Sequence, residues 1–144
     1  MTFLKKNNYY HLISRGAQEQ RLFETEDDCY FFLNLLEKFK GRFLIKILGC
    51  CLMPDHVHLI VHCEVSRQLS CFLQDVHQKY TIYFNVKYQR RGKLWQDRFK
   101  RIHLETESHA RNVLDAIGGL NLATVSPLLY SAQEHSLVYS ASPL

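Results

Sequence analysis

Two histidines one residue apart, His56 and His58, have the types and spacing that most directly suggest chemistry in this chain. They lie in the segment Met53-Pro54-Asp55-His56-Val57-His58-Leu59-Ile60-Val61, which alternates like a half-buried strand. Successive strand side chains point to opposite faces, so both imidazoles project from one face while Val57, Leu59 and Val61 pack on the other. A rigid histidine pair of this kind can bind a divalent metal ion. An ordinary solvent-facing pair is the alternative.

Basic and aromatic residues are interleaved between Lys87 and Arg101, where seven residues are basic and one, Asp97, is acidic. Basic side chains for phosphates, together with aromatic faces for unstacked bases, are typical of a single-stranded nucleic-acid groove. In the alternative, Trp95 and Phe99 only anchor a solvated loop to the core. We predict that Trp95 stacks a base and that the basic residues, with Arg15 from earlier in the chain, bind phosphates. The predicted DNA-binding set is Arg15, Arg90, Arg91, Lys93, Trp95, Arg98, Lys100 and Arg101.

The composition favours one globular domain. The chain has 144 residues, of which 47% are hydrophobic, and a net charge of +4. Its five cysteines are odd in number and form no CxxC pair, which favours reduced thiols in a cytoplasmic protein. No signal peptide or apolar run of membrane-spanning length is present, so we expect no membrane partner.

The patterns along the chain predict alternating strands and helices. Strands are expected at 7–15, 43–53 and 101–105, in addition to the histidine strand, which should form an antiparallel hairpin with 43–53. Thr25 and Asp28 have the spacing of a capping box that opens a first helix, and Gly41 ends it. Further helices are expected at about 67–88 and 106–118.

The order β-α-β-β-α-β-α predicts an α+β fold with a ferredoxin-like antiparallel sheet. The helices should cover one face of this sheet, leaving the other face to His56 and His58. We expect a single domain at 1–123 and a Ser-rich tail at 124–144 that is either docked or partly loose. His11 on the first strand is a further candidate for a place near the site, whereas His77 and His103 are expected at the surface.

The chain resembles the small tyrosine transposases of the HUH superfamily, in the branch of REP-associated and insertion-sequence transposases. Five stretches carry the resemblance in the family's order within residues 9–105: 10–16, 22–23, 52–61, 80–85 and 92–100. The resemblance implies that His56 and His58 hold Mg²⁺ or Mn²⁺ together with a polar residue of the last helix. It also implies that a tyrosine of that helix attacks a phosphodiester in single-stranded or hairpin DNA, leaving a 5′-phosphotyrosine and a free 3′-hydroxyl.

The chain departs from the family at the last helix, where a segment like Arg-Tyr-Ile-x-x-Asn-Pro is expected. The corresponding segment is 114–122, in which Ala116 takes the place of the nucleophilic tyrosine. Leu120 takes the place of the amide residue, or Asn121 does if one residue is inserted, which makes Asn121 a candidate third metal ligand. No tyrosine lies between Tyr88 and Tyr130.

Three explanations of this departure stay open. The chain is a decayed or domesticated copy that still binds DNA, or it has been altered at Ala116, or another tyrosine substitutes. Tyr130 is the first fallback nucleophile, with Tyr139, Tyr80 and Tyr83 behind it, although Tyr80 and Tyr83 fit a core stripe better.

The expected function is therefore that of a transposase-like protein that binds single-stranded DNA, with metal-dependent nicking and strand transfer as its inherited activity. A non-catalytic nucleic-acid-binding regulator is the alternative, and a nuclease that activates water is a third possibility. The protein is expected to be a monomer or a sheet-joined homodimer, with 43–53 and the histidine strand as candidate pairing strands.

Overall fold

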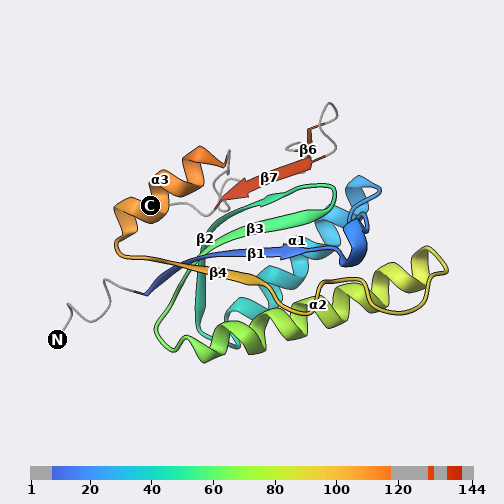
Figure 1. The fold of residues 1–144 in the computed structure, drawn as a ribbon, viewed down its shortest axis with the longest axis horizontal. Helices are drawn as coiled ribbons and strands as arrows, with labels where there is room; N and C mark the ends of the chain where they lie inside the picture. The colour runs from blue at the N-terminus through green and yellow to red at the C-terminus, as the bar shows by residue number, and fades with distance from the viewer. Residues whose placement is uncertain (1–7, 118–129, 132–135, 141–144) are drawn as a thin grey trace.

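The computed structural model describes residues 8–117 and the backbone of residues 130–131 and 136–140. A six-stranded sheet has the order β4-β1-β3-β2-β7-β6, with antiparallel neighbours (Figure 1). Its strands are β1 (Tyr9–Arg15), β2 (Ile45–Leu52), β3 (His56–Cys63), β4 (Lys100–Leu104), β6 (Tyr130–Ser131) and β7 (Ser136–Ser140). The helices are α1 (Glu26–Lys40), α2 (Arg67–Lys87) and α3 (Glu107–Ala116), with a short 3-10 turn, η2 (Ala17–Glu19), after β1. The α+β class and the antiparallel sheet are confirmed.

The predicted hairpin of β2 and β3 is present, with Leu52 opposite Val57 and Cys51 opposite His58. The pairing contains one irregularity, between Ile47 and Gly49. The strand begins at Ile45 rather than at residue 43, since Leu44 has a positive φ of 55°, which a strand does not accommodate.

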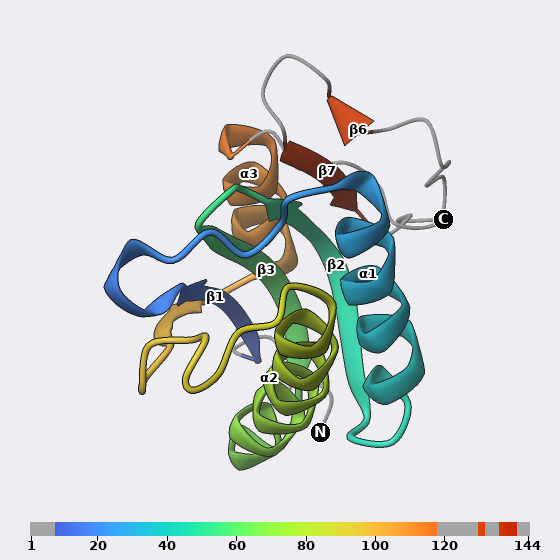
Figure 2. The ribbon, with the colours of Figure 1, turned by 90° about the vertical axis from the view of Figure 1, so that its right-hand side faces the viewer.

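Helices α1 and α2 pack side by side on one face of the sheet (Figure 2). The predicted alternation of β3 is confirmed, because Val57, Leu59 and Val61 all lie in the core beneath these two helices. Aromatic rings fill much of this layer, and Phe32, Phe72 and Tyr80 are fully buried.

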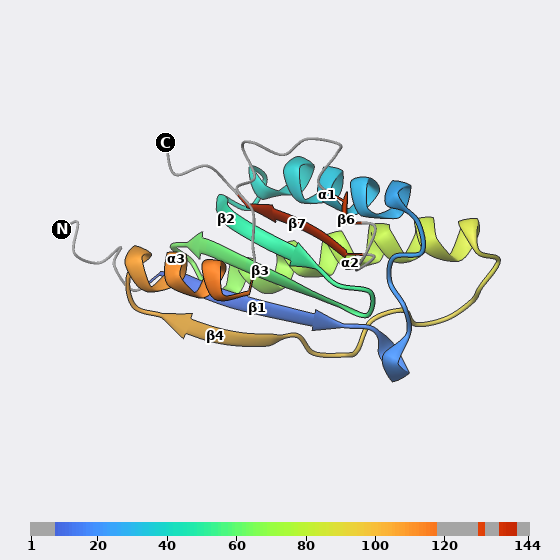
Figure 3. The same cartoon turned by 90° about the horizontal axis from the view of Figure 1, so that it is seen from above.

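The third helix corrects the expectation that all helices share one face. In Figure 3, α3 crosses the opposite side of the sheet from α1 and α2. There it forms a second, smaller core, made of Leu48, Ile60, Leu104, Ala110 and Leu114. Ile60 has the same strand parity as His56 and His58, so α3 covers part of the histidine face itself.

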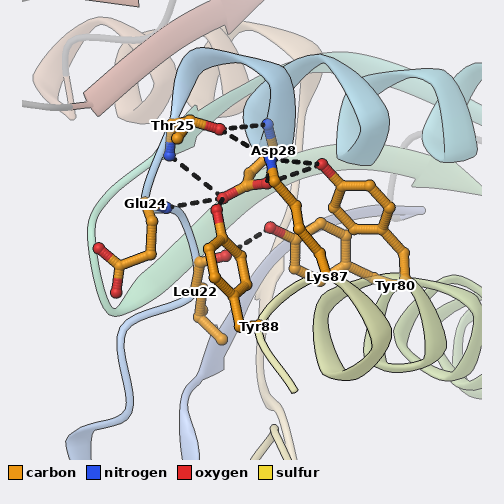
Figure 4. Close-up of polar contacts among 8 residues, drawn as sticks. Leu22, Glu24, Thr25, Asp28, Tyr80, Lys87 and Tyr88 are labelled. Atoms are coloured by element: carbon orange, nitrogen blue, oxygen red, sulfur yellow. Dashed lines mark hydrogen bonds and ion pairs between the residues drawn. The ribbon is translucent and has the colours of Figure 1, made fainter. Parts of the chain in front are cut away.

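Asp28 joins the start of α1 to the end of α2 (Figure 4). The predicted capping box is confirmed, because the Asp28 carboxylate accepts from the backbone N–H of Thr25 while Thr25 Oγ1 accepts from that of Asp28. Asp28 is fully buried, and it also accepts from Lys87 Nζ at 2.8 Å and from the Tyr88 hydroxyl at 2.6 Å. The carboxylate therefore holds together two elements that lie about sixty residues apart in the chain.

The strands expected to join two copies are both interior. β3 lies between β1 and β2, and β2 lies between β3 and β7, with Leu52 opposite Leu137. Their backbone groups are thus paired within the chain, and neither is an open edge (Figure 1). A sheet-joined dimer would have to use another strand or displace β7. In the part of the chain that the structure describes, no helix is long and apolar enough to cross a membrane.

Candidate metal and nucleic-acid site

The two histidines of β3 lie on one face, as predicted, with their ring centroids 5.0 Å apart. Both are partly buried. The neighbouring strand β1 places Arg15 directly opposite His56 and Ile13 opposite His58. Opposed residues of antiparallel strands share a face, so the Arg15 guanidinium is on the histidine side of the sheet. A basic side chain therefore accompanies the pair.

Each histidine uses its Nδ1 atom for a hydrogen bond. His58 Nδ1 is 2.9 Å from Nε2 of His11, which β1 projects onto the same face. His56 Nδ1 is 2.8 Å from Oδ1 of Asp55. In the described residues, neither histidine has a hydrogen bond at Nε2. Metal-binding histidines commonly have this arrangement, with one ring nitrogen held by a neighbour and the other free for the ion.

Burial favours the neutral form of His58 and of His11. Burial, together with the nearby His11, His56 and Arg15, lowers the pKa of His58 to about 4. The pKa of His11 is also below its usual value, mainly because of burial and secondarily because of Lys100. Neutral imidazole is the form that binds a metal ion, so the donor chemistry at His58 fits a divalent cation.

The described residues supply two candidate metal ligands, His56 and His58, rather than a full set. No group of three or more His, Cys, Asp or Glu side chains in this part of the chain is arranged to hold an ion. The Nε2 atom of the neighbouring His11 is engaged with His58. Asn121, the candidate third ligand, lies outside the described residues.

The basic loop is attached to the same end of the sheet. Gly16, just after β1, forms a bridge with Trp95, and the backbone N–H of Gln96 donates to the carbonyl of Arg15 at 2.8 Å. Beyond this bridge, Arg90, Arg91 and Lys93 line a hollow together with the turn that follows β1. Four of the predicted phosphate-binding residues therefore lie near one end of β1: Arg15, Arg90, Arg91 and Lys93. Arg98 lines a separate hollow between the loop and α2, together with Arg101.

Trp95 is a correction, because its ring is 5% exposed and packs in the main core. It stacks on His77 with the centroids 4.0 Å apart and the planes within 10°. An indole held in this way has no free face for a base, so the anchoring alternative is the right one for Trp95. Its partner His77 is a second correction, since the residue expected at the surface is partly buried, with its ring stacked on Trp95, and burial lowers its pKa to about 3.

The two basic residues of β4 lie on opposite faces. Lys100 is opposite Ile13 and so shares the histidine face. Arg101 is opposite Leu12, on the face of α1 and α2, where its guanidinium lies over the ring of Tyr10 and near the carbonyl of Ser66. Arg101 therefore does not belong to the surface around His56 and His58.

The fallback tyrosines of α2 are also on the wrong side for attack at the histidines. Tyr80 is fully buried in the α1–α2 core and donates to the carbonyl of Leu22, and Tyr83 donates to Asp28. The core-stripe interpretation is correct for Tyr80, whereas Tyr83 is partly buried at the edge of this core. Tyr130 lies in β6, three strands from β3, which corresponds to a backbone separation of about 14 Å. Its role as a nucleophile stays a prediction.

His11 is the site residue that the sequence indicated least clearly. Its only local signal is its spacing in β1, two residues from Ile13 and four from Arg15, which puts the three side chains on one face of the strand. Its proximity to His58 depends on the register of β1 against β3, which pairs residues about 47 positions apart.

A family model described as "Transposase IS200 like" matches residues 4–115, more than three quarters of the chain. The chain belongs to this family. The match includes both histidines, Arg15 and the basic loop. The resemblance inferred from the five sequence stretches is thereby confirmed.

Two solved structures of transposases show a similar fold. One is a REP-associated tyrosine transposase bound to a REP hairpin, which is 16% identical, with a TM-score of 0.58 over 76% of this chain and 64% of that chain. The other is a protein of Deinococcus radiodurans R1 named as a candidate transposase, which is 17% identical, with a TM-score of 0.57 over 78% of this chain and 89% of that chain. At these identities the likeness establishes the fold. This chain thus spans less than two thirds of the hairpin-bound transposase. A comparison of this chain with curated proteins found no match.

Helix α3 is where this member of the IS200-like family differs from the expected pattern. Ala116 is exposed at the end of α3 and lies one residue beyond the matched segment. The motif Arg-Tyr-Ile-x-x-Asn-Pro also fits Arg111-Asn112-Val113 in a second register, which puts Asn112 at the tyrosine position and Ala116 at the amide position. Asn112 and Ala116 are both exposed and four residues apart, so they share one side of the helix. Neither register provides a tyrosine.

Proposed function

We propose that this chain is a transposase-family protein that binds single-stranded or hairpin DNA across the histidine face and the adjoining basic loop. The observation that carries the proposal is the pair of β3 imidazoles, each held at Nδ1 and free at Nε2, beside Arg15. A purely structural pair would not need this arrangement. The hairpin bound by the REP-associated relative supports the same class of ligand for this chain.

His56 and His58, whose Nε2 atoms have no hydrogen bond in the described residues, would hold Mg²⁺ or Mn²⁺. When bound, the ion supplies Lewis-acid polarisation of a phosphodiester. Asp55 and His11 orient the two rings, since each engages an Nδ1 atom. Arg15 and the loop arginines bind the DNA backbone, which fixes its position on the protein without reading its sequence.

The chemistry of cleavage requires a nucleophile in addition to this site. The absence of a tyrosine from α3 favours a protein that has kept DNA and metal binding and has lost the family's covalent step. This second candidate function is a non-catalytic regulator that binds nucleic acid. The two candidates share their ligands and differ in whether a phosphodiester is broken.

The deciding experiment incubates labelled hairpin DNA with the protein and Mn²⁺ and separates the products on a denaturing gel. A metal-dependent DNA band joined to protein, absent in His56→Ala, would show an active transposase with a substitute nucleophile. Cleavage without an adduct would show a nuclease that activates water. We expect DNA binding with neither product.

A parallel titration tests the basic loop. Replacing Arg90 and Arg91 by Ala should weaken hairpin binding and reduce the slope of log K against log salt by about one for each phosphate that is no longer neutralised. Arg42→Ala is the matched control, because this arginine packs over Phe39 on the helical side of the molecule. Equal losses of affinity in the two variants would exclude the loop as the binding surface.

A further inference from the structure

An apolar groove runs between α1 and α2 on the side of these helices that faces away from the sheet. Its floor includes Leu35 of α1 and the rings of Phe31 and Tyr83, which stack at 3.9 Å with planes within 8°. Ile82 and Val86 form one wall and are 54% and 75% exposed. These two residues are four apart in α2, so they form a second apolar stripe, separate from the stripe that packs on the sheet.

Charge at the groove has one sign. Lys38 and Lys79 are exposed at its rim, and Lys87 lies at one end, while no Asp or Glu of the described residues lines it. Lys87 is neutralised by Asp28, but no ion pair engages Lys38 or Lys79 within the described part of the chain. The groove therefore combines a hydrophobic floor with uncompensated positive charge.

We infer that this groove binds an acidic amphipathic helix of a partner protein. An apolar groove between two neighbouring helices can accept the apolar face of a third helix, which contributes anchoring side chains at i, i+3 and i+4. Glutamate or aspartate on the flanks of that helix would pair with Lys38 and Lys79. The site lies on the opposite side of the sheet from His56 and His58, so a partner bound there leaves the DNA surface open, and the inference goes beyond the proposed function.

Two other occupants fit the groove less well. A symmetric contact between two copies would place the rim lysines of one copy against those of the other, because an isologous interface brings the same patch together. Nucleic acid would match the positive charge but not the aliphatic wall of Ile82 and Val86, which offers neither stacking surface nor hydrogen-bond donors.

The test uses a fluorescein-labelled designed helix of about 18 residues, with Leu at i, i+3, i+4 and i+7 and Glu on both flanks. A second peptide replaces every Glu by Lys. Anisotropy titrations with the full chain should show binding of the acidic peptide and at least about tenfold weaker binding of the basic one. The double variants Ile82→Ser/Val86→Ser and Lys38→Glu/Lys79→Glu should each lower the affinity for the acidic peptide by about tenfold or more.

The control variant is Val65→Ser, which removes an apolar residue of comparable exposure, 49%, away from the groove. It should bind the acidic peptide as the wild type does. Because Ile82 and Val86 are exposed, the serine variants should keep the wild-type melting temperature.

Three outcomes would overturn the inference. The first is equal affinity for the two peptides or no binding of the acidic one. The second is a wild-type dimer in light scattering that Ile82→Ser/Val86→Ser dissociates, which would assign the groove to a second copy. The third is weaker hairpin binding by Lys38→Glu/Lys79→Glu without an effect on the peptide, which would assign it to nucleic acid. The DNA-binding behaviour of variants at His56 or His58 tests only the proposed function and has no bearing on the groove.

Discussion

His58 and His11 share a hydrogen bond of 2.9 Å that fixes which nitrogen of His58 is free for a ligand. Nε2 of His58 has a free lone pair in the tautomer in which His58 Nδ1–H donates to His11 Nε2, and the bond fixes the orientation of the ring. Asp55 has the same relation to His56, and the hydrogen bond with His56 holds the pKa of Asp55 below its usual value. The two rings are thus prepared for binding by residues that need not contact the ion.

Replacing His11 by Phe should weaken Mn²⁺ binding by about 10–100-fold, because the ring of His58 loses its partner at Nδ1. The affinity would be measured by titration followed by electron paramagnetic resonance. Nitrogen-15 spectra of the metal-free protein would report the His58 tautomer directly. The control is His62→Phe, on the same face, where His62 packs on Tyr9 instead. Equal affinities in the two variants would contradict the positioning role of His11.

Replacing Asp28 by Asn should lower the free energy of unfolding by about 3 kcal/mol, since the buried carboxylate loses charge-assisted bonds from Lys87 and two tyrosines. Urea unfolding would measure the change. Asp27→Asn, at an exposed position of the same helical turn, should cost about 0.5 kcal/mol or less. A similar cost at both positions would show that only the helix dipole matters.

The stabilisation by Asp28 should depend on pH. Burial would raise the pKa of Asp28, but the hydrogen bonds from Lys87, Tyr88 and Tyr83 outweigh it and lower the pKa below its ordinary 3.8. The stabilisation is therefore present above this value and is lost as pH falls through the lower pKa of the folded state. The difference in the free energy of unfolding between the wild type and Asp28→Asn should therefore become smaller in strong acid.

At the scale of elements, the turn after β1 connects the histidine face to the basic loop. Gly16 donates to the carbonyl of Asp55 at 2.9 Å and bridges to Trp95, so three segments meet at one residue. A Cβ atom at Gly16 would lie 2.1 Å from the backbone carbonyl oxygen of Gln20. The turn can only close in this way around glycine.

Gly16→Ala should therefore destabilise the protein by about 2 kcal/mol and expose the bridge between β1 and the loop. Gly41→Ala is the matched control, since Gly41 has an α-helical φ of −70° and nothing within 4 Å of the added carbon. It should be neutral or stabilise by about 0.4–1 kcal/mol. Thermal unfolding measures both, and faster hydrogen exchange at the Gln96 amide would locate the effect. An unchanged Gly16→Ala protein would contradict the tight turn.

At the scale of the whole molecule, partly buried histidines lie on both sides of the sheet. His77 lies against Trp95 in the helical layer, and burial lowers its pKa to about 3, while burial and its neighbours lower that of His58 on the other face to about 4. In the unfolded chain each would bind a proton near its ordinary pKa of about 6.5. Between these values the unfolded state holds more protons, so stability should decrease as pH falls from about 6.5 toward 4.

We therefore expect the urea midpoint to be lower at pH 5 than at pH 7. His77→Phe keeps a flat ring against Trp95 but removes one of the titrating groups, so its midpoint should change less over the same interval. Identical pH dependence in the wild type and this variant would show that His77 is accessible to protons in the folded state. The measurement needs no DNA or metal, and it tests burial alone.

Much of the fold follows from local patterns in the sequence. Period-two alternation placed His56 and His58 on one face of β3, the spacing of Thr25 and Asp28 placed the start of α1, and both are confirmed. These features depend on residues within a few positions of one another, where backbone geometry alone relates spacing to direction. The same is true of the hairpin, whose turn at Pro54-Asp55 leaves little choice of pairing partner.

What only the tertiary structure decided involves contacts between distant segments. Strand order and long-range register decide four features of the site. They decide which side of the sheet α3 covers and that Trp95 is buried against His77. They also place Arg101 away from the site and bring His11 to His58. A helical or strand period indicates that a face is apolar, but not which surface will cover it. That choice is made by packing of the whole chain, in which the free energy of burying one face depends on every other element. The histidine pair was therefore predictable from the sequence, whereas its neighbours were not.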